Sequence, residues 1–208
     1  MSTLLAIEKT ISSFQELNNR FGLQRCIDES FFTEWQIPVG NLSDENKAFL
    51  DHLQQRYRNY YEADLLTEGT ILLSIVAPLL ERLGFHEPPC FVRSEVPVRI
   101  DVAERDEIYR GRIDVLVVRN LMWILTVEAK RSKFAVDIAL PQCLAYMSAS
   151  ETQPAFGMVT NGSDFMFCKL ENSIYDFSEP FSLLSRHNRL YEVATILSAL
   201  QKDFTQLT

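Results

Sequence analysis

The sequence lacks the residue clusters that mark several common classes of protein. Its four cysteines, Cys26, Cys90, Cys143 and Cys168, are scattered without a CxxC pair, and its three histidines are equally dispersed. This distribution favours free thiols in a reducing compartment over a disulfide framework or a zinc or iron–sulfur cage. Neither a GxSxG nucleophile motif nor a GxxxxGK[ST] loop occurs. These residues therefore predict neither a serine hydrolase nor an ATP-driven motor.

Long apolar runs are also missing. The longest uncharged stretch, Ile138 to Ser150, is interrupted by Pro141 and is shorter than the roughly 20 apolar residues that cross a bilayer. The amino terminus, MSTLLAIEKT, has no basic region followed by an apolar run, so no signal peptide is predicted. We therefore expect a cytoplasmic protein without membrane association.

Positive charge is scarce. The chain has 20 Lys and Arg against 28 Asp and Glu, a formal net charge of −8 at pH 7. This balance argues against a nucleic-acid partner, because phosphate binding needs clustered Lys and Arg. Between Arg93 and Lys133, however, basic residues outnumber acidic ones. The objection is therefore weakest for this segment.

Apolar residues are abundant enough for a sizeable core. The 208 residues are 47% hydrophobic and include 14 Phe, 7 Tyr and 2 Trp, as in a folded globular protein. The order of the elements predicts an α/β sandwich, a mixed central sheet flanked by helices. We assign residues 1–60 to a mostly helical N-terminal extension and residues 61–208 to the main domain. Apolar periodicity predicts strands over 91–101, 112–118, 122–129, 154–160 and 165–171, and helices over 44–61, 63–83, 141–149 and 189–204.

Two acids and a lysine are predicted on one face of a strand pair. Side chains alternate along a strand, so Glu128 and Lys130 share a face, and Asp114 lies on the preceding strand. A three-residue loop, 119–121, would pair Asp114 with Thr126 and make Glu128 its diagonal neighbour, with side-chain roots about 7–8 Å apart. A two-residue loop would put the acids on opposite faces unless a bulge intervened. We therefore expect a three-residue loop or a bulge near this turn.

Two interpretations of these charged residues stay open. Buried charge needs compensation, so the group could form a salt-bridged rim beyond the covered part of the sheet. It could instead be a metal site, because carboxylate oxygens are the ligands that Mg²⁺ prefers, and a coordinated water is a better nucleophile. A lysine beside such a site can orient that water or offset charge on a phosphate.

The residues around this group resemble the core motif of the PD-(D/E)XK nuclease superfamily. The string Val127-Glu128-Ala129-Lys130-Arg131 closely resembles that motif in the N-terminal nuclease domains of type I restriction enzyme R subunits. Gly111-Arg112-Ile113-Asp114 is similar to their Gly-Arg-x-Asp strand, with Ile113 in place of the superfamily's usual proline. Gln142 and Tyr146 match the Gln-xxx-Tyr signature, and Thr160-Asn161-Gly162 is similar to a strand-entry sequence of these domains. The resemblance covers about residues 61–170, and at the two ends of the chain we recognise no resemblance to a family.

The resemblance implies a restriction-endonuclease-like fold and a metal-dependent deoxyribonuclease without the helicase motor. Asp114 and Glu128 would bind Mg²⁺ (or Mn²⁺), with Glu68 from the second predicted helix as a further ligand. Lys130 and Gln142 would act on the attacking water or on the phosphate. A helix-surface glutamate is usually solvated, so Glu68 is the least specific member, and Glu62 and Asp64 compete with it.

Partners are also implied by the resemblance. DNA would be the substrate, contacted by Arg112 and Arg131, with Tyr146 as orienting support. Partner subunits of a restriction system are expected, and cutting both strands favours a homodimer. The acidic charge and the missing motor motivate an alternative, a catalytically silent nucleic-acid-binding or assembly module of a restriction or defence system. A regulatory partner of such a system is a third interpretation.

Overall fold

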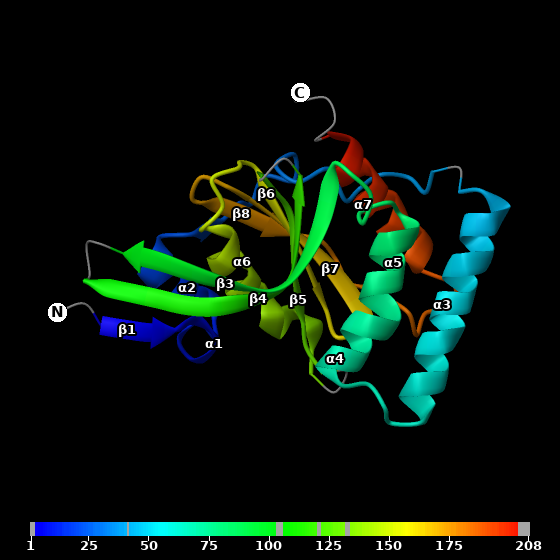
Figure 1. Ribbon diagram of the computed structural model, residues 1–208. Coiled ribbons are helices and arrows are strands. Elements are labelled where there is room, and N and C mark those ends of the chain that lie inside the picture. The colour runs from blue at the N-terminus through cyan, green and yellow to red at the C-terminus, as the bar shows by residue number, and fades with distance from the viewer. Residues whose placement is uncertain (1–2, 41, 103–105, 120–121, 132–133, 204–208) are drawn as a thin grey trace.

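The computed structural model describes residues 3–40, 42–102, 106–119, 122–131 and 134–203. A nine-stranded mixed sheet crosses its centre (Figure 1). The strands are β1 (Thr3–Ala6), β2 (Gln24–Arg25), β3 (Cys90–Val102), β4 (Glu107–Arg119), β5 (Met122–Ala129), β6 (Ala155–Thr160), β7 (Asp164–Glu171), β8 (Ile174–Phe177) and β9 (Phe181–Ser182). The helices are α1 (Ile7–Thr10), α2 (Phe14–Phe21), α3 (Asp44–Glu62), α4 (Glu68–Ile71), α5 (Ala77–Arg82), α6 (Leu140–Met147) and α7 (Leu190–Asp203).

The sheet has the strand order β1-β4-β5-β6-β7-β8-β2, with β3 paired to β4 and β9 to β7. β3 pairs with β4 along nearly its whole length, so β1 and β5 must share the other edge of β4. β1 runs parallel to Glu107–Arg110, and β5 runs antiparallel to Val115–Arg119. Residues 111–114 of β4 therefore lie between the stretch that pairs with β1 and the stretch that pairs with β5.

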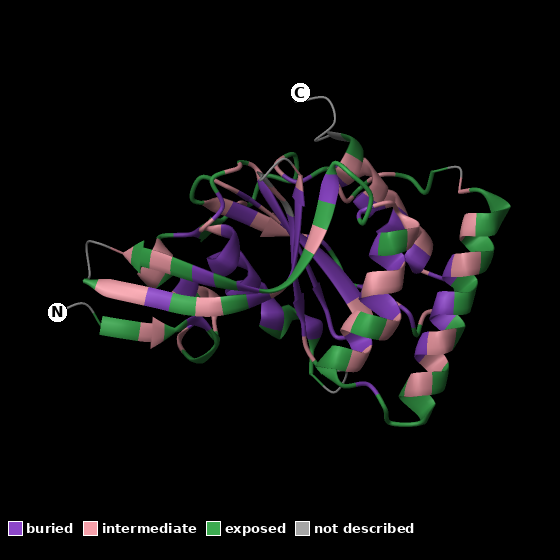
Figure 2. Ribbon diagram, viewed as in Figure 1, coloured by how far each residue is buried: buried purple, intermediate pink, exposed green. Residues whose placement is uncertain are grey.

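Apolar side chains form a layer on each face of the sheet. One core cluster joins the sheet to α3, α4, α5 and α7, and the other joins it to α1, α2 and α6. Figure 2 shows the central strands as mostly buried and the outer helix faces as exposed. Strands covered on two sides are continuously apolar, which is why residues 112–118 and 122–129 could be identified as strands. The α/β sandwich with a mixed sheet flanked by helices is confirmed.

The helix expected over 63–83 begins later and is interrupted. Asp64 has a φ of 54°, in the left-handed region, which ends the preceding helix. Thr67 then caps α4, and its hydroxyl accepts a hydrogen bond from Thr70 N. A π-helical turn, Leu72–Val76, separates α4 from α5. The predicted start at residue 63 was therefore wrong, because the capping threonine and not the apolar periodicity decides where the helix begins. Glu68 is thereby placed in the first turn of α4.

Residues 3–25 belong to the same sheet as the rest of the chain. β1 pairs with β4 and β2 pairs with β8, both in parallel, and α2 contacts α6. The segment assigned to a helical extension thus also contributes strands, while the boundary at residue 60 stays a prediction. Strands this short carry little periodicity of their own. Among the helices of the described ranges, none has the length and apolarity needed to cross a membrane.

Candidate active site

Asp114 and Glu128 lie across from each other where β5 ends. In the antiparallel pair of β4 and β5, Val115 pairs with Val127. Continued by one residue, this register sets Asp114 directly opposite Glu128. Directly opposed residues of an antiparallel pair share a face of the sheet. The two acids are therefore neighbours in space although 13 residues of chain lie between them.

A bulge in the hairpin produces this pairing. The register of β4 against β5 shifts between Val117 and Val118, and one residue of β5, Ile124, has no partner in β4. Of the two alternatives that the sequence predicted, a three-residue loop or a bulge, the structure has the bulge. The predicted pairing of Asp114 with Thr126 is wrong, because Thr126 instead pairs two residues further along β4. The correction makes the two acids direct rather than diagonal neighbours.

The two carboxyl groups are held differently. Asp114 Oδ2 accepts a hydrogen bond from Ala129 N at 2.8 Å. Glu128 is only 1% exposed, and its Oε1 accepts a hydrogen bond from Lys130 Nζ at 2.7 Å. The other oxygen, Glu128 Oε2, is buried without a hydrogen-bond partner in the described structure. A buried anionic oxygen without a partner is costly, so a cation beside this atom would be stabilising.

Burial dominates the electrostatics of the acids. It raises the pKa of the Glu128 carboxyl to about 8; repulsion from Asp114 adds to this effect, and Lys130 opposes it. Burial also raises the pKa of Asp114, against the hydrogen bond from Ala129 N and the attraction of Lys130. A bound cation would favour both ionised forms.

Burial acts on the pKa of the neighbouring Lys130 in the opposite direction. Burial lowers the pKa of Lys130, but attraction to Glu128, the hydrogen bond to it and attraction to Asp114 and Glu68 together outweigh burial, so the pKa of this ammonium lies above its ordinary value. Lys130 therefore carries a positive charge at neutral pH. Its backbone is fixed as well, because Lys130 N donates to Thr160 O at 2.8 Å and so extends the pairing of β5 with β6.

α6 brings the Gln-xxx-Tyr pair to the same place. Pro141 lies in the first turn of this helix, as predicted. Gln142 Nε2 donates to Tyr146 Oη at 3.0 Å, and the same hydroxyl accepts a hydrogen bond from Arg112 N at 3.2 Å. Tyr146 is fully buried. It therefore positions Gln142 and β4, as expected of orienting support, and it does not line the cavity that Gln142 lines.

These side chains surround one cavity of about 370 Å³. Six of the predicted site residues line it: Glu68, Arg112, Asp114, Glu128, Lys130 and Gln142. The competitors of Glu68, which are Glu62 and Asp64, do not line it. Arg131 is exposed and lies outside it. Residues from three segments that are far apart in the sequence thus meet around one hollow.

The cavity also contains residues that sequence reasoning missed. Glu8, Ile11 and Ser12 come from the N-terminal segment, and Ile138 comes from the turn before α6. Nothing in the local sequence marks Glu8, since it stands in no motif and in a helix of four residues that follows a short strand. The available signal was weak, an acid just beyond an apolar stretch.

The donor set of the cavity fits a hard divalent cation. Among the described residues, no three His, Cys, Asp or Glu side chains converge closely enough to form a complete cage. Mg²⁺ needs no such cage, because it keeps several waters and binds through one or two carboxylates. Asp114 and the unpartnered Glu128 Oε2 supply these, and Ala129, whose carbonyl is a further oxygen donor, directly follows Glu128 in the chain. The residues present therefore fit the ion that the fold implies.

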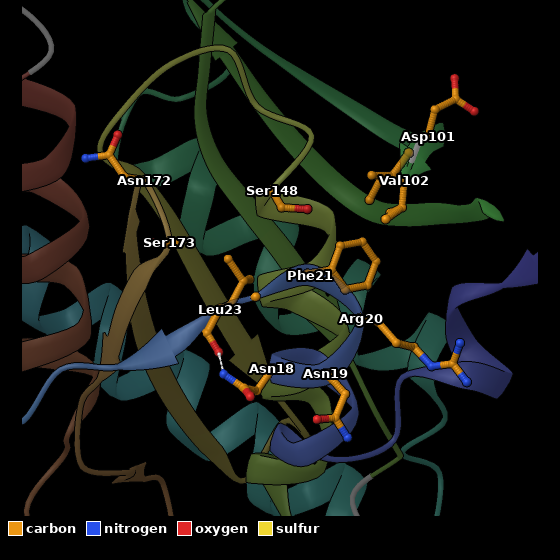
Figure 3. A pocket seen from close by; sticks show the side chains of 12 residues that line it. Asn18, Asn19, Arg20, Phe21, Leu23, Asp101, Val102, Ser148, Asn172 and Ser173 are labelled. Carbon is orange, nitrogen blue, oxygen red and sulfur yellow. Dashed lines mark hydrogen bonds between the residues drawn. The ribbon is translucent and has the colours of Figure 1, made fainter. Parts of the chain in front are cut away.

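A larger cavity, of about 600 Å³, lies elsewhere, between the end of α2 and the end of β3 (Figure 3). Asn18, Asn19, Arg20, Asp101, Ser148 and Asn172 line it, and Asn18 Nδ2 donates to Leu23 O at 3.1 Å. It contains none of the predicted site residues and no pair of carboxylates on neighbouring strands. The smaller cavity, with its buried acids, is therefore the candidate active site.

Fold and site together define an α/β sandwich with a mixed sheet that carries two acids and a lysine near the ends of adjacent strands. The profile of the family described as "Type I restriction enzyme R protein N terminus" matches residues 4–174. The chain belongs to this family. The match begins in β1, so it includes the N-terminal segment that carries Glu8.

One solved structure illustrates the similarity. It is a fragment assigned as an HsdR subunit of a type I restriction enzyme from Vibrio vulnificus YJ016, with 20% sequence identity and a TM-score of 0.43. The match covers 60% of the present chain and 25% of that chain, so the present chain spans only part of the longer protein. No curated protein matches significantly.

Proposed function

We propose that this chain is a divalent-metal-dependent deoxyribonuclease that hydrolyses phosphodiester bonds. The observation that carries the proposal is the direct opposition of Asp114 and Glu128, with one buried carboxylate oxygen left without a partner, in a cavity that also contains Lys130 and Gln142. A salt-bridged rim would satisfy its charges with one another. Here one oxygen of the buried Glu128 is unsatisfied, and Glu128 lines a hollow.

Each residue has a role that follows from its contacts. Asp114 and Glu128 would hold Mg²⁺ or Mn²⁺, with the Ala129 carbonyl and Glu68 as further oxygen donors. The ion, when bound, supplies a more acidic water and offsets charge on the phosphate. Lys130 remains protonated because attraction to Glu128 raises its pKa. It would therefore orient the attacking water or the phosphate by donating hydrogen bonds, and removal of the water's proton is not assigned to it.

Gln142 is the second polar group aimed at the substrate. Its Nε2 is held by Tyr146, which leaves the amide oxygen to accept a hydrogen bond from water or to turn toward the phosphate. Arg112 lines the cavity, although Glu95 partly neutralises it at 3.3 Å. We propose Arg112 as a phosphate contact and Arg131 as a more distant one, outside the cavity.

DNA is the proposed substrate because the family profile describes part of a restriction enzyme. Partner subunits of a restriction system are proposed on the same ground, and a homodimer remains a proposal for cutting both strands. The net charge of −8 favours one alternative, a catalytically silent binding or assembly module of such a system.

The test is cleavage of plasmid DNA with Mg²⁺ or Mn²⁺ by the wild type, Asp114→Asn and Lys130→Met. We expect cleavage by the wild type alone, with losses of at least about 100-fold in the variants. The same proteins are titrated with Mn²⁺ and followed by thermal unfolding. Cation-dependent stabilisation without cleavage would favour the silent module, and activity that survives both substitutions would rule out this site.

A further inference from the structure

The N-terminal segment brings an additional acid to the cavity. Glu8 lies in α1, directly after β1, and it lines the cavity together with Asp114, Glu128 and Glu68. In the chain, Glu8 stands more than a hundred residues before Asp114. Its position therefore depends entirely on how β1 and α1 pack against the rest of the fold.

The sheet explains why Glu8 arrives there. β1 runs parallel to β4 and ends where Ala6 pairs with Arg110. β5 approaches from the other direction along the same edge and ends opposite Asp114. The two chain segments leave the sheet toward each other, over residues 111–114. Glu8 follows the end of β1 on one side of residues 111–114, and Glu128 and Lys130 lie at the end of β5 on the other side.

Two buried isoleucines fix the orientation of this segment. Ile7 is 0% exposed and Ile11 is 2% exposed, and both belong to the core cluster under α6. Residues four apart share a helical face, so Ile7 and Ile11 anchor one side of the segment. Glu8 and Ser12 follow them by one position each, and both line the cavity. The anchoring thus directs the carboxylate into the site.

Glu8 has no structural use in the described chain. Its side chain is exposed and forms no ion pair or hydrogen bond with the described residues. Its charge instead acts against the partly buried Asp114 and the buried Glu128, since it contributes to the raised pKa values of both. Among the residues that the structure describes, four carboxyl groups therefore line one cavity with two basic side chains, Arg112 and Lys130. The independent indication of a cation is again the buried, unpartnered Glu128 Oε2.

We propose that Glu8 is a further acidic group of the cation site and accepts hydrogen bonds from the waters of a hydrated divalent cation held at Asp114 and Glu128. The inference rests on the proposed metal-dependent function and adds to it a residue from outside the nuclease motif. Mg²⁺ retains several waters when bound to protein, and carboxylates that bind the waters of a metal contribute to its affinity. Glu8 is therefore a positioning residue for the hydrated ion.

The experiment compares Glu8→Gln with the wild type in the absence of DNA. Mn²⁺ and, separately, cobalt(III) hexaammine are titrated by calorimetry, because the second ion keeps its ammine ligands and reports contacts made through the ligand shell. We expect Glu8→Gln to weaken the binding of both ions about 10-fold. The matched control is Glu29→Gln, an exposed glutamate of the same N-terminal region that does not line the cavity, and it should bind as the wild type does.

Three outcomes separate the failure of this inference from the failure of the proposed function. If Asp114→Asn weakens Mn²⁺ binding and Glu8→Gln does not, the assignment of Glu8 is overturned and the metal site stands. If neither variant weakens binding, the proposed function itself fails. The metal-free Glu8→Gln protein should unfold at the same temperature as the wild type or higher, since a repulsive charge is removed. A lower unfolding temperature would show that Glu8 is a structural residue and would overturn the inference.

Discussion

Tyr146 occupies the space that a side chain at position 111 would need. A Cβ atom added to Gly111 would lie 2.7 Å from the Tyr146 hydroxyl oxygen and 2.6 Å from Cε1 of its ring. This close approach lets the hydroxyl accept the hydrogen bond of Arg112 N while it holds Gln142. The glycine of the Gly-Arg-x-Asp strand is thus required by packing between β4 and α6.

The first prediction concerns this contact. Gly111→Ala should destabilise the protein by about 1–3 kcal/mol, because a well-packed core accommodates an added methyl group only by displacing its neighbours. Displacement of Tyr146 should also misplace Gln142 and lower DNA cleavage. Urea unfolding and plasmid cleavage measure the two effects.

Gly69→Ala is the matched control for this substitution. A Cβ at Gly69 meets nothing within 4 Å, and alanine favours a helix by up to about 1 kcal/mol over glycine. Its free energy of unfolding should be equal to that of the wild type or higher. An equal loss of free energy of unfolding in Gly111→Ala and Gly69→Ala would contradict the packing argument.

The second prediction concerns pH and the free energy of unfolding without metal. Burial raises the pKa of Glu128 from 4.5 to about 8, so between these values the folded state binds more protons than the unfolded state. The free energy of unfolding should therefore fall as pH rises through this window, by up to about 1.4 kcal/mol per pH unit. Urea unfolding in EDTA at several pH values from 5 to 8 measures this slope.

Glu128→Gln should flatten the slope and stabilise the metal-free protein near pH 8, since an amide carries no charge to bury. Glu151→Gln, at an exposed position outside the cavity, should retain the wild-type slope. A wild-type free energy of unfolding that rises across this window would refute the assignment of Glu128 as a proton-holding buried acid.

The third prediction concerns the effect of Lys130 on the pKa of Glu128. Lys130→Met removes the 2.7 Å ion pair with Glu128 and with it the attraction that favours the ionised carboxyl group. The pKa of Glu128 should then rise further, and Mn²⁺ should stabilise the variant only at a higher pH than it stabilises the wild type. Thermal unfolding with and without Mn²⁺ across the pH range detects the displacement. If Mn²⁺ began to stabilise the variant and the wild type at the same pH, Lys130 would have no influence on the ionisation of Glu128.

The fourth prediction isolates the tyrosine hydroxyl. Tyr146→Phe keeps the ring but leaves Gln142 Nε2 and Arg112 N without their acceptor, which should cost about 1–3 kcal/mol of stability. Because Tyr146 is buried and does not line the cavity, substrate binding should change less than turnover. Steady-state cleavage kinetics should therefore show a lower kcat with a nearly unchanged KM, and a change in KM alone would contradict the positioning role.

Local patterns could identify the strands, the later helices and the motif residues. Residues 112–118 and 122–129 are continuously apolar because the sheet is covered on both faces, and such runs can be recognised from the sequence alone. The expectation of a bulge also followed from local logic, since side chains alternate and the acids had to share a face. The exact pairing did not follow, because a bulge at Ile124 and a turn of a different length are nearly equivalent in sequence.

The N-terminal strands could not be identified in the same way. β1 and β2 have four and two residues, and their stability comes from their partners in β4 and β8. Their apolar residues match no period long enough to be recognised. Glu8 was missed for this reason, since an isolated glutamate is ordinarily a solvated surface residue.

The linear order of residues determined the fold class and the identity of the two acids, the lysine and the glutamine, because strand alternation and motif spacing act over a few residues. Tertiary structure decided which acids meet. The parallel pairing of β1 with β4 carries Glu8 to the cavity, and the capped start of α4 brings Glu68 there. Contacts between distant segments depend on burial and hydrogen bonding with partners that no local pattern contains, so only the folded chain reveals them.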